Sequence, residues 1–340
     1  MISKRLIELG VMAFRQKNVR GTFKPHFSVK FRSPEDGSIR VFSVDTTRTP
    51  NKYPQPDAYL ITHAHSDHYG KSAMLSERSI CSDKTAVALE IRHGKKYKGS
   101  TVKVTEAIDV NGVTVKTYPT GHTAGSTAFY WENDLGTRIL VTGDVKDASN
   151  LPECDVLITE ANYGDPSDFT CYFEDDTTGF RNALNGTGSV AFGAYAFGKA
   201  QRTVGLLRDF GYNGAIEMER ISLELTQQLI DDCGELVGLG ESTGERVCVV
   251  PPWELDKLPS DIAKYVLTGR SDYRYPTIQI SDHLDAQGLL DMVNVVNPQI
   301  AIVYHPNGNR PERFAAHLNS IGIESVSIHR INNVLSNEFI

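Results

Sequence analysis

The chain has 340 residues, of which 40% are hydrophobic and 23% charged, with a formal net charge of −7 and five scattered cysteines that argue against a disulfide framework. This length allows two domains, or one large domain with an insertion, in an ordinary folded protein. Because no apolar run approaches the roughly 18 residues that cross a bilayer, and the first residues lack the apolar stretch of a secretion signal, we expect a cytoplasmic protein without a membrane partner.

Short strands dominate the first half of the chain. Six runs rich in β-branched or aromatic residues predict strands, at 39–44, 57–62, 113–118, 127–131, 138–143 and 156–160. Near residue 161 the pattern changes to strands that alternate with helices, which predicts a partly parallel α/β unit. The last 60 residues repeat this alternation, with Leu289, Met292, Val293 and Val296 at the core spacing of a helix.

Three histidines and an aspartate fall within six positions, in the stretch HAHSDH that follows the predicted strand at 57–62. His63 and His65 are two residues apart, so at a strand end their side chains point the same way. Asp67 and His68 follow in the turn. Imidazole and carboxylate are the usual zinc ligands of hydrolytic sites, so the cluster predicts a metal site rather than a polar surface loop.

Three further polar residues stand at predicted strand ends, namely His122 in TGHTAGS, Asp144 in TGDVKD and His305 in VYHP. Taken singly, each would be an ordinary loop residue. With the HAHSDH stretch they complete two ligand sets: His63, His65 and His122 for one metal; Asp67, His68 and His305 for the other; and Asp144 as a bridge. Zinc is the expected ion, and manganese also suits nitrogen and oxygen ligands.

These motifs resemble the metallo-β-lactamase fold and, more narrowly, the β-CASP nucleases, which include ribonuclease J, the nuclease of the cleavage and polyadenylation factor, and Artemis-type DNA nucleases. Asp45 in VDTT resembles the family's first motif, and the three metal-ligand stretches resemble the second to fourth. Asp57 matches a carboxylate expected to orient a ligand histidine. Glu160, His283 and His305 match the three motifs of the β-CASP branch.

The resemblance implies an α/β fold, in which a metallo-β-lactamase αβ/βα sandwich holds an inserted α/β β-CASP domain. The expected boundaries are 1–160 and 279–340 for the two parts of the sandwich and 161–278 for the insertion.

The resemblance also implies a zinc-dependent nuclease, an exonuclease, an endonuclease or both, that acts in RNA processing, 3′-end maturation or decay. A hydroxide shared by two metals would attack phosphorus, with Asp67 and Asp144 among the catalytic residues. His283 would be the general acid because an imidazole titrates near neutrality. Glu160 would hold His283 in position or neighbour a metal ligand. The alternative for His283 is a capping or core residue.

Substrate grip would come from phosphate contacts, with exposed Lys95, Lys96 and Lys98, and with Lys199 at a helix start. The insertion itself is acidic, with 18 acidic and 10 basic residues over 161–278. RNA is favoured over single-stranded DNA because Artemis-type members tend to carry valine where this chain has His305. A homo-oligomer is left open.

Other functions remain as alternatives. A DNA exonuclease of the Artemis type would share the metal centre. A small-molecule hydrolase of the same fold would not explain an insertion of this length, and a transfer-RNA 3′ processing enzyme should lack the Glu160 and His283 pair. An inactive scaffold would typically have lost metal ligands, whereas this sequence retains each of them.

Overall fold

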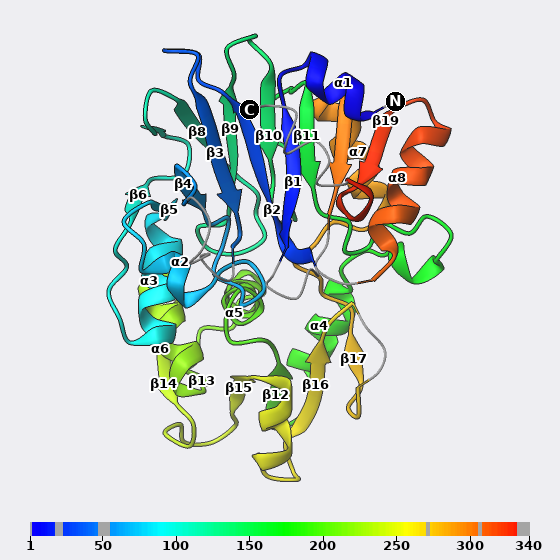
Figure 1. Ribbon diagram of the computed structural model, residues 1–340. Coiled ribbons are helices and arrows are strands. Elements are labelled where there is room, and N and C mark those ends of the chain that lie inside the picture. The colour runs from blue at the N-terminus through cyan, green and yellow to red at the C-terminus, as the bar shows by residue number, and fades with distance from the viewer. Residues whose placement is uncertain (1, 18–22, 47–54, 270–272, 305–307, 332–340) are drawn as a thin grey trace. The chain divides into compact units, whose positions relative to one another are not determined.

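The computed structural model describes residues 2–17, 23–46, 55–269, 273–304 and 308–331 (Figure 1). The chain forms two compact units, which are described separately. Unit 1 comprises Met1–Leu89, Lys96–Tyr172 and His283–Ile340, and unit 2 comprises Glu90–Lys95 and Phe173–Asp282. Among the described residues, no helix is long and apolar enough to cross a membrane.

The boundary between the units differs from the expected start of the insertion at 161. Residues between 161 and 172 stay with unit 1 for two physical reasons. Ala161 is fully buried in a core cluster that also contains Phe314, and the guanidinium of Arg313 donates to the carboxylate of Asp165. At the other end, unit 2 extends to Asp282 instead of 278.

The first sheet of unit 1 has the order β1-β2-β3-β4-β5-β6. Its strands are β1 (Met12–Lys17), β2 (Phe23–Arg32), β3 (Ile39–Val44), β4 (Ala58–Leu60), β5 (Ser79–Ser82) and β6 (Ser100–Val102). The β1–β2 and β2–β3 pairs are antiparallel, and the pairs from β3 to β6 are parallel. Three helices accompany it in the chain: α1 (Ile2–Glu8), α2 (Lys71–Met74) and α3 (Asp83–His93).

The second sheet of unit 1 has the order β19-β18-β11-β10-β9-β8-β7. Its strands are β7 (Ala107–Asp109), β8 (Thr114–Pro119), β9 (Thr127–Glu132), β10 (Arg138–Val141), β11 (Val156–Thr159), β18 (Ile300–Val303) and β19 (Glu324–Ser327). Pairing is antiparallel from β7 to β10 and parallel from β10 to β19. The helical segments of this part are η1 (Phe169–Cys171), α7 (Ala286–Val296), α8 (Arg310–Ser320) and η3 (Ile328–Arg330).

The two sheets of unit 1 pack against one another, as β9 illustrates. Side chains alternate across a strand, so Phe129 and Trp131 enter the core shared with the first sheet. The Trp131 ring lies 5.3 Å from the ring of Phe42 in β3. Ala128 and Tyr130 of β9 face the other way, into a cluster with residues of α7 and α8. Unit 1 is therefore a mixed-sheet sandwich with helices on the outer face of its second sheet (Figure 1).

Unit 2 is a separate α/β unit built on a six-stranded sheet with the order β14-β13-β15-β12-β16-β17. Every described strand pair in this sheet is parallel, in line with the alternation of strands and helices in the sequence. Its strands are β12 (Val190–Gly193), β13 (Ile216–Met218), β14 (Leu236–Gly238), β15 (Val247–Val250), β16 (Ala263–Leu267) and β17 (Thr277–Ile278). Its helices are α4 (Thr177–Leu184), α5 (Lys199–Asp209), α6 (Arg220–Leu229) and η2 (Pro252–Lys257).

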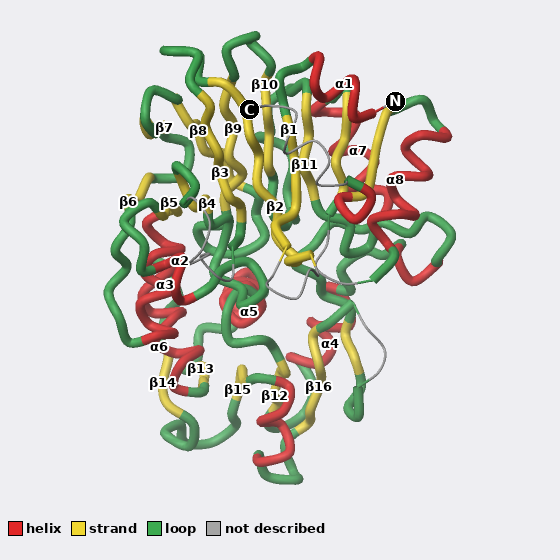
Figure 2. The backbone as a smooth tube through the Cα atoms, viewed as in Figure 1, coloured by secondary structure: helices red, strands yellow, loops and turns green. Residues whose placement is uncertain are grey.

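Loops at the carboxyl ends of strands in unit 1 carry the polar motifs, and Figure 2 draws these loops in green. HAHSDH follows β4, His122 follows β8, Asp144 follows β10 and Glu160 follows β11. Buried strands hold the start of each loop, so the motif side chains sit on a rigid scaffold.

Candidate metal centre

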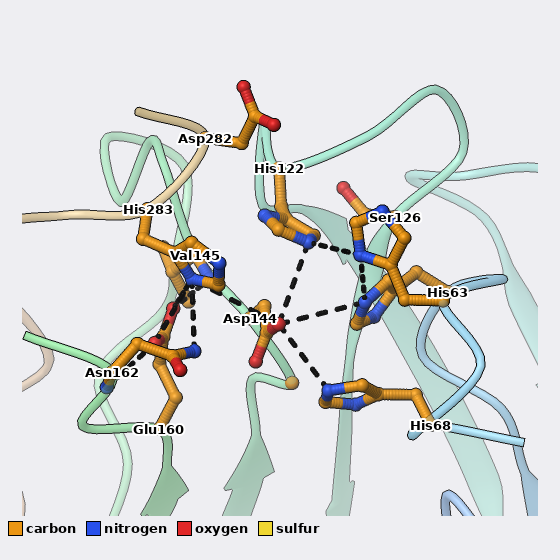
Figure 3. Close-up of polar contacts among 12 residues, drawn as sticks. His63, His68, His122, Ser126, Asp144, Val145, Glu160, Asn162, Asp282 and His283 are labelled. Atoms are coloured by element: carbon orange, nitrogen blue, oxygen red, sulfur yellow. Dashed lines mark hydrogen bonds and ion pairs between the residues drawn. The ribbon is translucent and has the colours of Figure 1, made fainter. Parts of the chain in front are cut away.

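One buried carboxylate oxygen, Oδ2 of Asp144, is the hub of the site (Figure 3). Around it lie Nε2 of His68 at 3.3 Å, Nε2 of His122 at 3.5 Å, Nε2 of His63 at 3.7 Å and Nδ1 of His283 at 3.9 Å. Four imidazole rings from three different stretches of sequence thus converge on a single oxygen.

The spacing of these ligand atoms fits a tetrahedral zinc-class ion. Nδ1 of His65 lies 3.1 Å from Nε2 of His63 and 3.0 Å from Nε2 of His122. With Asp144, these three histidines offer four ligand atoms that lie within 4.8 Å of one another. A tetrahedral centre with zinc–nitrogen bonds of about 2.0–2.1 Å separates neighbouring ligand atoms by about 3.3 Å, which the separations of 3.0–3.7 Å bracket.

Asp45 is the carboxylate that orients a site histidine. Its Oδ2 accepts from Nδ1 of His68 at 2.8 Å, and its Oδ1 accepts from the backbone N–H of Thr62 at 2.8 Å. Asp45 itself has a φ of +47°, a left-handed conformation that aspartate tolerates better than most residues. Asp57 instead accepts from the backbone N–H of Val41 at 2.8 Å, so this contact supports the pairing of β3 with β4.

A second group lies beside the hub and consists of Asp144, Glu160 and His283. Nδ1 of His283 lies 3.0 and 3.2 Å from the two carboxylate oxygens of Glu160. Glu160 is held in turn by the backbone N–H groups of Val145 at 2.7 Å and Asn162 at 3.1 Å. Because Glu160 is 1% exposed while the His283 side chain is 22% exposed, the carboxylate is fixed and the imidazole remains accessible.

Burial and mutual charge shift the pKa values of this cluster. Burial lowers the pKa of His63 well below its usual value, and neighbouring His68 and His122 lower it further. Burial would also lower the pKa of His68, but Asp144 and Asp45 outweigh it and raise that pKa well above its usual value. Burial would raise the pKa of Asp144, yet the surrounding imidazoles, His68 first, keep it well below the ordinary range. Asp144 is therefore an anion, the form that binds a cation.

The expected second ligand set is only partly assembled. His68 contacts the hub, but Oδ2 of Asp67 lies 3.9 Å from Nε2 of His68 and the Asp67 side chain is 53% exposed. Asp67 is not in the described clusters that could hold a metal. His305 lies outside the described residues.

The candidate substrate lysines differ in their surroundings. Lys95, Lys96 and Lys98 are exposed. Lys199 is buried in unit 2, where its ammonium donates to the backbone carbonyl of Ile280 at 2.8 Å and lies 3.5 Å from Asp282. Burial lowers the pKa of Lys199, and Asp282 partly opposes this. Lys199 therefore anchors the segment before His283 within unit 2, instead of standing exposed for a phosphate.

Two polar neighbours of the site were missed in the sequence. The side-chain nitrogen of Asn162 lies 3.1 Å from Nδ1 of His283, and the hydroxyl of Tyr304 donates to Asp45 at 3.2 Å. Asn162 stands two residues after Glu160 and Tyr304 directly after β18, but an isolated asparagine or tyrosine at such a position carries no signal of its own.

Comparisons with known proteins agree with this geometry. Residues 54–186 match the metallo-beta-lactamase superfamily. An RNase J-like protein of Methanocaldococcus jannaschii is 27% identical over 191 residues, which are 47% of this chain and 45% of that protein. A probable DNA ligase of Opitutus terrae is 25% identical over 319 residues, which are 83% of this chain and 30% of that protein.

A crystal structure of a protein of unknown function from Enterococcus faecalis V583 superposes with a TM-score of 0.64 and 10% identity, covering 93% of this chain and 96% of that one, which supports the fold alone. The chain spans less than half the length of each of the two sequence relatives. Residues 54–186, which carry His63, His65, His122 and Asp144, are thus a region of the metallo-beta-lactamase superfamily.

Proposed function

We propose that this chain is a metal-dependent hydrolase of the phosphodiester bonds of nucleic acid, with RNA as the preferred substrate. The observation that carries the proposal is the contact between His283 and the buried Glu160, 3.9 Å from the oxygen on which the metal-site histidines converge. An accessible imidazole held by a carboxylate beside a metal site is the arrangement that a general acid requires. The similarity to an RNase J-like protein supports a nucleic-acid substrate.

The residues divide into metal holders and a proton donor. His63, His65, His122 and Asp144 would hold one ion. Asp67, His68 and Asp144 would contribute to a second, together with His305, which is outside the described residues. Zinc-class ions supply Lewis acidity toward phosphoryl oxygens and activate water at neutral pH.

His283 carries the proton that the leaving oxygen needs. Its Nδ1–H donates to Glu160, so the opposite nitrogen, Nε2, is the one that gives a proton to the departing ribose or deoxyribose oxygen. The negative charge of Glu160 favours the doubly protonated ring before transfer. After transfer, Nδ1 keeps its hydrogen and Glu160 keeps the ring in place.

DNA is the second candidate substrate, because the relative named a probable DNA ligase aligns with 83% of this chain. The metal centre and His283 would act identically on either polymer, since the scissile phosphodiester is the same. Preference for RNA rests on the resemblance described above for His305, and a 2′-hydroxyl would need its own hydrogen-bonding partners.

The experiment compares wild-type protein with His283→Ala on matched single-stranded RNA and DNA, labelled at the 5′ or 3′ end. We expect His283→Ala to slow cleavage by roughly 10²–10⁴-fold while the metal content stays constant. His317→Ala, a change in α8 of unit 1, is the matched control and should cut at the wild-type rate. Loss of metal in His283→Ala would make that residue a ligand, and DNA cut as fast as RNA would end the claim of preference.

A further inference from the structure

We propose that Tyr304 is a positioning residue that acts through Asp45 to aim both His63 and His68 at the metal centre. The inference rests on the metal centre of the proposed function. It concerns a hydrogen-bond network behind that centre, made of Thr62, Asp45 and Tyr304 and lying entirely within unit 1.

Asp45 collects four hydrogen bonds. Its Oδ1 accepts the backbone N–H of Thr62 at 2.8 Å. Its Oδ2 accepts the Thr62 hydroxyl at 2.9 Å, Nδ1 of His68 at 2.8 Å and the Tyr304 hydroxyl at 3.2 Å. Asp45 is 1% exposed and Tyr304 is 3% exposed, so these bonds replace hydration that the carboxylate loses on burial.

The directions of these hydrogen bonds fix the tautomers of two ligands. The only hydrogen on the Thr62 hydroxyl goes to Asp45, so Thr62 Oγ1 accepts from Nδ1 of His63 across 3.1 Å. His68 likewise uses Nδ1 to donate to Asp45. Both rings therefore turn a lone pair on Nε2 toward Asp144, at 3.7 and 3.3 Å. Such partners behind a metal-binding imidazole set the orientation and basicity of the ring.

Tyr304 is suited to hold Asp45 because its own place is fixed. It directly follows β18, its backbone N–H donates to the carbonyl of Thr159 at 2.8 Å, and its ring packs edge-on against Phe27 at 4.8 Å. Asp45 has the left-handed backbone described above, which costs conformational energy in a non-glycine residue. The phenol hydroxyl thus ties a strained aspartate in a loop after β3 to a rigid strand of the other sheet.

The test compares Tyr304→Phe with Tyr130→Phe. Both remove one hydroxyl from a buried tyrosine of unit 1 that donates to a carboxylate, because Tyr130 donates to Glu132 at 3.1 Å. Zinc affinity of the metal-free protein is measured by competition with a chromogenic chelator, and the Co²⁺ absorption spectrum reports ligand geometry. We expect Tyr304→Phe to lose roughly 10–100-fold in zinc affinity and to change the Co²⁺ spectrum. Tyr130→Phe should match wild type in both.

Equal zinc affinity in Tyr304→Phe and wild type would overturn the inference, as would an equal loss in Tyr130→Phe. If Tyr304→Phe does not fold, Thr62→Val and Thr62→Ser test the same network. Valine removes the hydroxyl and should weaken zinc binding, whereas serine keeps the hydroxyl and should restore it; equal zinc affinity in these two variants would contradict the network. The zinc titration contains no nucleic acid. Normal zinc binding without RNA or DNA cleavage would therefore overturn the proposed function alone.

Discussion

Nε2 of His68 lies 3.3 Å from Oδ2 of Asp144, and the two side chains are only 2% and 7% exposed. A buried carboxylate interacts strongly with nearby charges because little water screens it. The same oxygen also lies within 4 Å of His63, His122 and His283. Asp144 is therefore the side chain whose charge matters most to this cluster, and it links the metal holders to the proton donor.

Replacing Asp144 with asparagine should remove metal from the site. The amide keeps the shape of the side chain but loses the negative charge that a bridging ligand supplies. We expect metal content to fall by at least one ion per chain and cleavage to fall by more than about 10²-fold. Elemental analysis and a cleavage assay measure this. Asp134→Asn, at an exposed turn position, is the control, and full metal content in Asp144→Asn would argue against the bridging role.

Gly143 is expected to be essential for the position of Thr62. A Cβ at this residue would lie 2.6 Å from Cβ and Oγ1 of Thr62, and the φ is +64°. Gly136 has a similar φ of +74° with no atom within 4 Å of its Cβ position. Gly143→Ala and Gly136→Ala should therefore both lose about 1 kcal/mol of stability from backbone strain. Only Gly143→Ala should also lose zinc affinity. Equal zinc affinity in the two variants, measured beside their thermal unfolding, would contradict this reading.

Glu217 should make unit 2 sensitive to acid. Burial would raise the pKa of Glu217, but Arg246 and the N–H groups of Gly240 and Ser242 lower it from 4.5 to about 2. A folded pKa below the unfolded one gives stability that is present above pH 4.5 and is lost as the pH falls toward 2. Glu217→Gln should thus reduce the free energy of unfolding by about 2–3 kcal/mol at pH 7, and this difference should shrink progressively below pH 4.5.

Urea unfolding at pH 7 and at pH 3 measures this difference. Glu224→Gln, at an exposed position of α6, should leave stability unchanged at both values. A Glu217→Gln effect of the same size at pH 7 and pH 3 would show that packing, and not charge, is responsible.

The exposed Lys95, Lys96 and Lys98 are expected to contact phosphates. Replacing all three with alanine should weaken RNA binding at low salt and leave metal content unchanged. Each phosphate contact on single-stranded nucleic acid contributes about 0.7 to the slope of log affinity against log salt, so the slope should become shallower by about 2. Lys257→Ala, an exposed lysine paired with Glu254, is the control. An unchanged slope in the triple variant would remove these lysines from the interface.

The strands and the main metal site could be predicted from the sequence because both depend on local patterns. The strand predicted at 39–44 has those bounds in the structure, and β9 and β11 lie within one residue of their predicted ends. His63 and His65 could be assigned because the HAHSDH stretch is dense and follows a strand. His122 and Asp144 could be assigned because each lies in a glycine-containing turn after a strand.

Other features depend on contacts between distant residues, which no local pattern contains. Lys199 has an exposed-looking place at a helix start, yet its partner Ile280 stands 81 residues later. Asp57 and Asp45 are both aspartates near β-strands, and only the pairing of β3 with β4 decides that Asp57 bonds Val41 while Asp45 bonds His68. The boundary of unit 2 was misplaced for the same reason, since the Asp165–Arg313 pair joins segments 148 residues apart.

The most direct test of the metal-dependent nuclease is cleavage of labelled single-stranded RNA by protein that has been stripped with a chelator and then titrated with zinc. The stripped protein should not cut. Cleavage should return as zinc is added and should level off near two equivalents per chain, as two ligand sets that share Asp144 require. Cleavage by the stripped protein at the rate of the untreated protein would contradict the account. So would zinc-loaded protein that cuts neither RNA nor DNA.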